Sequence, residues 1–340
     1  MKAAVFHGPK VGLRIEEVAV PSAGRDQIVV KVAACGVCHT DLHYIEHGVP
    51  TFKTPPIILG HEASGVVADV GAGVTTFKRG QSVLIPAVLT CGHCVFCRMG
   101  RENICANMVM LGNHIDGAYA EYVAVPAKDV LELPATIPLQ EACIIADAVS
   151  TPYHAVKNRA RVRPGDTVVV FGCGGVGINA VQLAAVAGGW VIAVDVHERK
   201  LEWARSFGAA HTINASQVER VSKEVKKLTG GGADIAIEVI GNPRTIEEAL
   251  ECVRIGGRLC VVGYTKEAMS IMAGKIMFKE LEIVGSLGCR PLDYRPLIRL
   301  VEQGTIEIKR LVTHRFKLDE LPKAFEVMHE GVSLRSIVIP

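Results

Sequence analysis

The chain has 340 residues, which is long enough for two domains rather than one small core. Hydrophobic residues make up 49% of the sequence and charged residues 21%, as is usual for globular enzymes. The formal net charge of +2 argues against nucleic acid or an anionic membrane as a partner, and the first ten residues contain no apolar run of signal-peptide length, so we expect a cytoplasmic protein.

The first part of the chain, up to about residue 147, is predicted to be mostly β. Short runs rich in β-branched residues are separated by glycine and proline. The clearest of these runs are residues 27–32, 63–70, 81–85 and 119–125. This pattern predicts a barrel-like domain of Greek-key type.

Two segments of this region carry residues suited to an open metal site. Cys38 and His61 provide one thiolate and one imidazole, which is typical of a zinc ion that keeps a position for substrate. A third ligand must come from a distant part of the chain. Asp147 is one candidate, because an unpaired carboxylate would be costly in its largely apolar surroundings, and Cys143, four residues earlier, is the alternative.

Four of the eleven cysteines form a second cluster with the spacing C-x-x-C-x-x-C-x7-C, which favours a metal over disulfides. They are Cys91, Cys94, Cys97 and Cys105. Four thiolates close a tetrahedron around zinc and leave no place for substrate, so a structural zinc is expected, with an iron–sulfur cluster as the alternative. The isolated cysteines in apolar surroundings are expected to be buried fillers: Cys35, Cys173, Cys252, Cys260 and Cys289.

From about residue 151 the pattern changes to alternating strands and helices, which predicts a doubly wound parallel sheet. The expected elements are 167–171, 176–187, 191–194, 199–207, 234–238, 245–252 and 258–262. The tail from about residue 287 is predicted to hold two helical segments and a final strand at 336–340.

The segment 166–195 is the most informative part of this region, because it runs from a strand through a glycine cluster into a helix and a second strand. Gly172 suits the tight turn, Gly174 the close approach of a pyrophosphate, and Gly177 the close packing of helix on strand. Asp195 ends the second strand, where it would accept hydrogen bonds from the adenosine ribose. Residues 167–194 carry no charge, but the glycines and polar residues within them favour a buried dinucleotide-binding unit over a membrane span.

The chain resembles the zinc-containing medium-chain alcohol dehydrogenases over essentially its whole length. The motifs that carry the resemblance are GVCHTD (36–41), GHEASG (60–65), the four-cysteine lobe, DGAYAEY (116–122) and FGCGGVG (171–177). The resemblance implies an α/β architecture, with a GroES-like β-barrel catalytic domain at 1–148 and 287–340 and a Rossmann NAD-binding domain at 149–286. It also implies homo-oligomers, dimers or tetramers, that pair around residues 281–287.

The resemblance further assigns roles to individual residues. Cys38, His61 and Asp147 would hold the catalytic zinc, with Glu62 as an occasional fourth ligand and Asp41 fixing the tautomer of His61. Many family members have cysteine where Asp147 stands, and many have arginine where His39 stands.

The chemistry implied is oxidation of an alcohol, which zinc acidifies so that its carbon can give a hydride to the nicotinamide ring. Thr40 would take the proton and pass it through the nicotinamide ribose to His43, which delivers it to solvent. Further contacts to the cofactor are implied for His39, Thr151, Gly175, Val176, Lys200, Val262 and Arg335. Asp195 favours NAD over NADP, because a carboxylate repels a 2′-phosphate.

The substrate is the least determined feature of the sequence. A secondary or cyclic alcohol, oxidised to a ketone or aldehyde, is the first hypothesis. Several stretches also resemble dehydrogenases that act on 6-hydroxycyclohexenyl-carbonyl-CoA, and Lys53, Lys78, Arg290 and Arg295 are candidates for binding the phosphates of such a substrate. A non-catalytic protein that binds zinc and nucleotide, and a zinc-free quinone reductase, are the alternatives from other classes.

Overall fold

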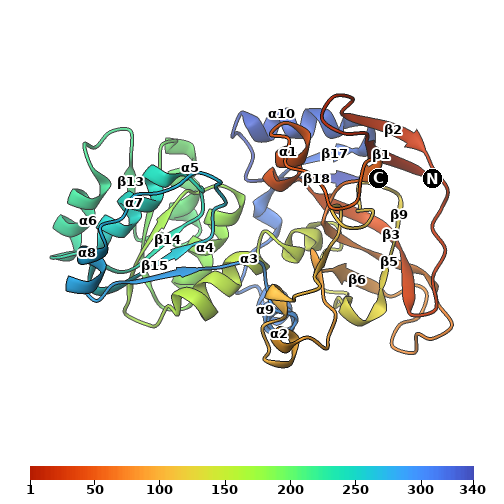
Figure 1. Ribbon diagram of the computed structural model, residues 1–340, viewed down its shortest axis with the longest axis horizontal. Helices are drawn as coiled ribbons and strands as arrows, with labels where there is room; N and C mark the ends of the chain where they lie inside the picture. The colour runs from red at the N-terminus through yellow and green to blue at the C-terminus, as the bar shows by residue number, and fades with distance from the viewer. The chain divides into compact units, whose positions relative to one another are not determined.

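A computed structural model describes residues 1–340, and the chain divides into two compact units. Unit 1 comprises Met1–Ala148 and Arg290–Pro340, and unit 2 comprises Val149–Cys289. The two ends of the chain therefore fold into the same unit, as the colours of Figure 1 show, and unit 2 is inserted between them in sequence.

A seven-stranded, largely antiparallel sheet forms the frame of unit 1, in the order β10-β6-β5-β3-β18-β17, with β9 paired to the other part of β3. Its strands are β3 (Gln27–Gly36), β5 (Glu62–Val70), β6 (Ser82–Ile85), β9 (Tyr122–Pro126), β10 (Leu131–Glu132), β17 (Val312–Lys317) and β18 (Arg335–Ile339). Alternate residues of β9 are buried, as the period of two along a strand requires. The last strand of the chain thus lies beside β3, which leads into the first metal motif.

Two smaller sheets and several helices complete unit 1. The smaller sheets contain β1 (Lys2–Phe6), β2 (Leu13–Glu17) and β4 (Ile57–Ile58), and separately β7 (Val88–Leu89) and β8 (Val109–Met110). The helices are α1 (His39–Ile45), α2 (Val95–Arg98), α9 (Pro291–Glu302) and α10 (Leu321–His329), and the 3-10 segments are η1 (Glu102–Ile104), η2 (Ala127–Asp129), η3 (Glu141–Ala146), η5 (Lys309–Leu311) and η6 (Leu318–Glu320). Tyr119 and Phe6 belong to the buried core of this unit.

Unit 2 is a six-stranded parallel sheet in the order β13-β12-β11-β14-β15-β16. The strands are β11 (Thr167–Phe171), β12 (Trp190–Asp195), β13 (His211–Asn214), β14 (Ala233–Glu238), β15 (Val253–Val261) and β16 (Glu282–Gly285). The helices are α3 (Ser150–His154), the π-helical η4 (Ala155–Ala160), α4 (Gly175–Val186), α5 (Glu198–Ser206), α6 (Val221–Thr229), α7 (Pro243–Cys252) and α8 (Ala273–Phe278). The strand order reverses between β11 and β14, and such a switch point is where parallel sheets bind ligands, beyond the carboxyl ends of the strands.

The predicted fold class is confirmed, with a β-rich unit and a doubly wound parallel sheet. The strand β16 lies within residues 281–287, where the family resemblance implied the last strands of this sheet. The sequence did not predict β13 and β17. Both are strands at the edge of a sheet, and edge strands are partly exposed and therefore lack a continuous apolar pattern. The predicted strand at 119–125 begins three residues later, at Tyr122.

None of the helices could span a membrane, because the longest, α4 and α9, have only 12 residues. The uncharged segment 167–194 is instead β11, α4 and most of β12, and α4 buries eight of its residues.

Candidate active site and metal centres

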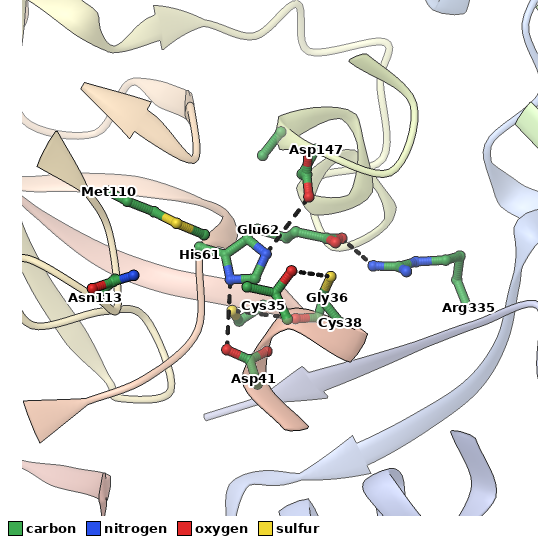
Figure 2. Close-up of polar contacts among 12 residues, drawn as sticks. Cys35, Gly36, Cys38, Asp41, His61, Glu62, Met110, Asn113, Asp147 and Arg335 are labelled. Atoms are coloured by element: carbon green, nitrogen blue, oxygen red, sulfur yellow. Dashed lines mark hydrogen bonds and ion pairs between the residues drawn. The ribbon is translucent and has the colours of Figure 1, made fainter. Parts of the chain in front are cut away.

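Four side chains of unit 1 meet with potential metal-ligand atoms within 4.8 Å of one another: Cys38, His61, Glu62 and Asp147. Cys38 immediately precedes α1, His61 immediately precedes β5, Glu62 is the first residue of β5, and Asp147 follows η3. Figure 2 shows these side chains converging from the three segments. Asp147 is therefore the predicted ligand that the fold brings to Cys38 and His61, and Cys143 is not among the converging side chains.

The spacing of this set suits a zinc ion. His61 Nε2 lies 3.6 Å from Asp147 Oδ2. Two ligands of a tetrahedral zinc with bonds of about 2.1 Å are about 3.4 Å apart, so the two distances are close. His61 is 1% exposed, and both of its ring nitrogens are buried without a hydrogen-bond partner. Burial alone would lower the pKa of His61, but Asp41, Cys38 and Asp147 together hold it well above the ordinary value. Such an excess of acidic groups around one imidazole favours a divalent cation.

Asp41 and Tyr119 lie in a row behind His61. Asp41 Oδ1 lies 3.5 Å from His61 Nδ1, on the side of the ring opposite Asp147, and Asp41 is fully buried. The hydroxyl of Tyr119 donates to Asp41 Oδ2 over 2.8 Å. Burial and Asp41 raise the pKa of Tyr119 well above its usual range, so the hydroxyl keeps its proton and stays a donor. The motif DGAYAEY contains Tyr119, but the sequence did not reveal this role.

Glu62 is held by Arg335, a pairing that the sequence did not predict. Arg335, the first residue of β18, donates from Nη2 to Glu62 Oε2, and the two side chains are 5% and 0% exposed. Burial raises the pKa of Glu62, and the positive charge of Arg335 opposes that rise. Gly36 leaves the room for this carboxylate, because a Cβ there would lie 2.2 Å from Glu62 Oε2. The predicted contact of Arg335 with a pyrophosphate stays a prediction.

The predicted relay residues lie on α1, directly after Cys38. Thr40 Oγ1 is 3.5 Å from Cys38 Sγ, so its hydroxyl lies next to the potential ligand set. His43 is one helical turn further along and half-buried, and its Nδ1 lies 3.0 Å from Nδ1 of His47. His39 is exposed at the start of the helix.

The second metal group brings together Cys91, Cys94, Cys97 and Cys105 in the loop segment around α2 and η1. Three of their Sγ–Sγ distances are 3.5, 3.9 and 3.9 Å. Two sulfurs bound to one tetrahedral zinc with bonds of about 2.3 Å are about 3.8 Å apart, so these distances suit a zinc ion. All eleven cysteines are free, so no disulfide competes for these sulfurs.

The backbone around these four cysteines favours thiolates. The amides of Cys94 and Asn107 donate to Cys91 Sγ and Cys105 Sγ over 3.3 and 3.4 Å. The amides of His93 and Cys94 lower the pKa of Cys91 to about 6, whereas burial beside the other sulfurs raises that of Cys97 to about 12. Four thiolates this close together repel one another, and a bound cation would compensate their negative charge.

In unit 2, the glycine-rich turn has the geometry that its sequence predicted. Gly172 has a φ of +93°, and a Cβ on Gly177 would lie 1.8 Å from the carbonyl oxygen of Gly172. At Gly174, by contrast, a Cβ would meet nothing within 4 Å, which leaves the backbone open to a ligand. Gly175 and Val176 begin α4, so their amides belong to the helix N-terminus, where phosphates are favoured.

Asp195 stands at the carboxyl end of β12 and is already bonded to the backbone around it. Its Oδ2 accepts from the amide of Cys173 over 2.8 Å, and its Oδ1 accepts from Val196 and His197 over 2.8 and 3.0 Å. These bonds fix the carboxylate against the glycine-rich turn. The other implied cofactor contacts of this unit are Thr151 in α3, Lys200 in α5 and Val262 directly after β15.

Known proteins with similar sequences identify the family. The family model of the alcohol dehydrogenase GroES-like domain matches residues 24–135, and that of the zinc-binding dehydrogenases matches residues 175–303. An L-threonine 3-dehydrogenase of Bacillus licheniformis is 34% identical over 100% of this chain and 99% of its own length. An alcohol dehydrogenase of Moraxella sp. (strain TAE123) is 35% identical over 100% of this chain and 99% of its own length.

This chain belongs to the zinc-containing medium-chain alcohol dehydrogenase family. It is an oxidoreductase of the zinc alcohol dehydrogenase type that uses zinc and a nicotinamide cofactor. Its fold agrees with a solved zinc-binding dehydrogenase of Sinorhizobium meliloti 1021 bound to NADP, with a TM-score of 0.91 and 32% identity over 100% of this chain and 99% of the other. The predicted fold and enzyme class are therefore confirmed.

Proposed function

We propose that this dehydrogenase oxidises a secondary or cyclic alcohol to a ketone or aldehyde, reversibly, with NAD. The observation that carries the proposal is the convergence of Cys38, His61, Glu62 and Asp147, with Asp41 orienting the imidazole. When bound there, zinc supplies a Lewis acid that acidifies an alcohol. Cys38, His61 and Asp147 would hold the metal, and Glu62, paired with Arg335, would be an occasional fourth ligand.

The proton of the alcohol leaves along α1 in this proposal. The hydroxyl of Thr40, beside Cys38, can accept one proton while it gives up its own. His43 receives the proton and passes it outwards, because a neutral imidazole is a competent base near neutral pH. Burial and His47 lower the pKa of His43, which keeps this imidazole neutral and ready to accept.

Unit 2 is proposed to bind the cofactor through the glycine-rich turn, with the pyrophosphate at the start of α4. Asp195 supports NAD rather than NADP, because its carboxylate is fixed beside the turn and would repel a 2′-phosphate. The NADP bound to the Sinorhizobium meliloti relative shows why this preference has to be measured.

The CoA-ester alternative has less support from the charges of unit 1. Arg290 donates twice to Asp293 over 2.8 Å, and Lys53 lies 2.6 Å from Asp116, so both cations already have an acidic partner. A simple or cyclic alcohol therefore stays the first hypothesis.

We also propose that the chain forms a homo-oligomer through the β16 edge of unit 2. The helix α8, which precedes this strand, buries none of its six residues. Phe278 is 84% exposed, Met272 75% and Met277 70%, which is costly for large apolar side chains in water. β16 is also an unpaired edge of the sheet. Light scattering should give a molar mass that is a multiple of the 36.4 kDa of one chain, and Phe278→Asp should lower this molar mass.

Two measurements test the proposed activity. Metal analysis should find about two zinc ions per chain, one for each ligand group. NAD-coupled oxidation should then be measured over aliphatic, cyclic and CoA-linked alcohols. Cys38→Ala should lose one zinc and the activity, whereas Cys252→Ala, a buried cysteine of α7, should keep both zinc ions. A chain with no zinc would instead support the quinone reductase, and a chain with two zinc ions but no oxidation of any alcohol would support the non-catalytic alternative.

A further inference from the structure

A second histidine, His47, lies against the proposed relay residue His43. The two Nδ1 atoms are 3.0 Å apart, within hydrogen-bond distance, and the ring centroids are 5.2 Å apart with the planes tilted by 44°. His43 is half-buried and His47 is exposed. The pair thus joins a partly covered imidazole to one in contact with solvent.

The end of α1 holds this pair in place. The helix ends at Ile45, and the amide of His47 still points to the carbonyl of Leu42, at 3.4 Å. Gly48 then adopts a left-handed conformation with a φ of +65°, which turns the chain back so that the amide of Val49 donates to the carbonyl of His43 over 3.0 Å. His47 is therefore fixed one turn beyond His43, at the helix end where the macrodipole favours a cation.

The two carboxylates closest to the pair in sequence, Glu46 and Asp41, are engaged elsewhere. Glu46 Oε1 lies 2.9 Å from His329 Nε2 of α10, and Asp41, on the buried face of α1, is bonded to Tyr119 and lies beside His61. No carboxylate is paired with His47, so a proton that arrives there is not trapped in an ion pair.

The contact between the two Nδ1 atoms offers a path for a proton from one ring to the other. One ring must donate and the other accept, because each Nδ1 can either carry a proton or offer a lone pair. If Nδ1 of His43 carries the proton, Nε2 of His43 is the nitrogen that can accept one from the reaction. The incoming proton then makes His43 a donor at both nitrogens.

We propose that His47 is a second relay residue, which takes the proton from His43 and releases it to solvent. A proton bonds to Nε2 of His43, the Nδ1–H bond of His43 breaks, and its proton bonds to Nδ1 of His47. The cationic His47 loses its Nε2 proton to water or a buffer base. The pair resets when water removes the proton from Nε2 of His43 and supplies one to Nε2 of His47, while the shared proton returns to His43. This inference rests on the proposed alcohol oxidation and acts through His43.

The test compares His47→Gln with His329→Gln, an exposed histidine of α10 beside the same helix end. The initial rate of alcohol oxidation is measured on the zinc-loaded enzyme at saturating NAD and alcohol, across pH and over a series of imidazole buffer concentrations. We expect kcat of His47→Gln to fall about tenfold at low buffer and to recover as imidazole rises, because a proton-transfer group contributes at least this much. KM for the alcohol and the zinc content should not change. His329→Gln should behave like the wild type.

A double variant separates a relay from a structural effect. If His47 acts through His43, His43→Ala with His47→Gln should be no slower than His43→Ala alone. Buffer-independent rates in His47→Gln, or the same loss from His47→Gln in both backgrounds, would overturn the relay. A wild type that oxidises no alcohol of the panel would refute the proposed function and with it the relay, whereas an active wild type with an unaffected His47→Gln would refute the relay alone.

Discussion

The substitution Asp41→Asn tests whether the buried chain behind His61 controls zinc binding. Asparagine keeps the size of the side chain and can still accept the hydrogen bond from Tyr119, so the change removes mainly the negative charge next to His61. It also brings an amide donor to His61 Nδ1. A donor there favours the tautomer that is protonated on Nε2, the nitrogen that faces Asp147.

The size of the effect follows from the geometry. Loss of the carboxylate behind a histidine ligand weakens metal binding by about 10–100-fold, or about 1.4–2.7 kcal/mol. The 3.5 Å separation of Asp41 Oδ1 and His61 Nδ1 is long for a hydrogen bond, which favours the lower end of this range of affinity loss. Both groups are at most 1% exposed, so solvent screens their interaction little. We therefore expect zinc to bind the catalytic site about tenfold more weakly.

The assay is zinc competition with a chromophoric chelator, which resolves the two sites of the same chain. The four-cysteine site shares no residue with Asp41 and is the internal control. Asp319→Asn is the matched variant, because Asp319 is an exposed aspartate that pairs with Lys2. A catalytic-site affinity within threefold of the wild type, or an equal loss at both sites, would refute the reasoning that Asp41 acts through His61.

Three further predictions concern the cofactor, the pH profile and the ion pair. Asp195→Ala should lower the preference for NAD over NADP, and an unchanged ratio of NAD to NADP activity would show that another residue discriminates. The same change should lower the free energy of unfolding by about 1–3 kcal/mol, because the amides of Cys173, Val196 and His197 lose their acceptor. Burial and His47 lower the pKa of His43 below 6.5, so the rate of oxidation should hold as pH falls to 6.5 and decline only below it, where His43 becomes protonated. In His43→Ala the rate near neutral pH should drop, and buffer bases should restore part of it. An unaltered pH profile would exclude His43 from the relay. Arg335→Met should lower the free energy of unfolding by about 3–5 kcal/mol, because it leaves Glu62 buried without its cation. Glu62→Gln in the same chain should restore part of that loss. A loss below about 1 kcal/mol would show that the buried pair does not stabilise the fold.

The sequence predicted the glycine-rich turn well because its function is local. Gly172, Gly174 and Gly177 are within six residues, and each role follows from the missing Cβ and a known strand–turn–helix pattern. The four-cysteine lobe is predictable for the same reason. The choice between Asp147 and Cys143 was not local, because it depends on how η3 presents its neighbours to Cys38 and His61.

The contacts that the sequence missed join residues that are far apart in the chain. Glu62 and Arg335 are 273 positions apart, and Tyr119 and Asp41 are 78 apart, and no motif connects either pair. The pairing of His43 and His47 has the i, i+4 spacing of a helix and was accessible in principle. It was not predicted because α1 has only seven residues and its helical pattern is too short to recognise.

The buried charges explain why the fold of unit 1 and its catalytic metal depend on each other. Cys38, Asp41, Glu62 and Asp147 are acidic groups around one imidazole, and Arg335 is the cation that compensates one of them. Burying the remaining negative charge without a counterion is costly, so the arrangement is stable only with a divalent cation or with protons. Because Glu62 is tied to Arg335, the proposed metal would be held by Cys38, His61 and Asp147. In the proposed function, three protein ligands would leave a fourth position for the alcohol, as the chemistry of a catalytic zinc requires.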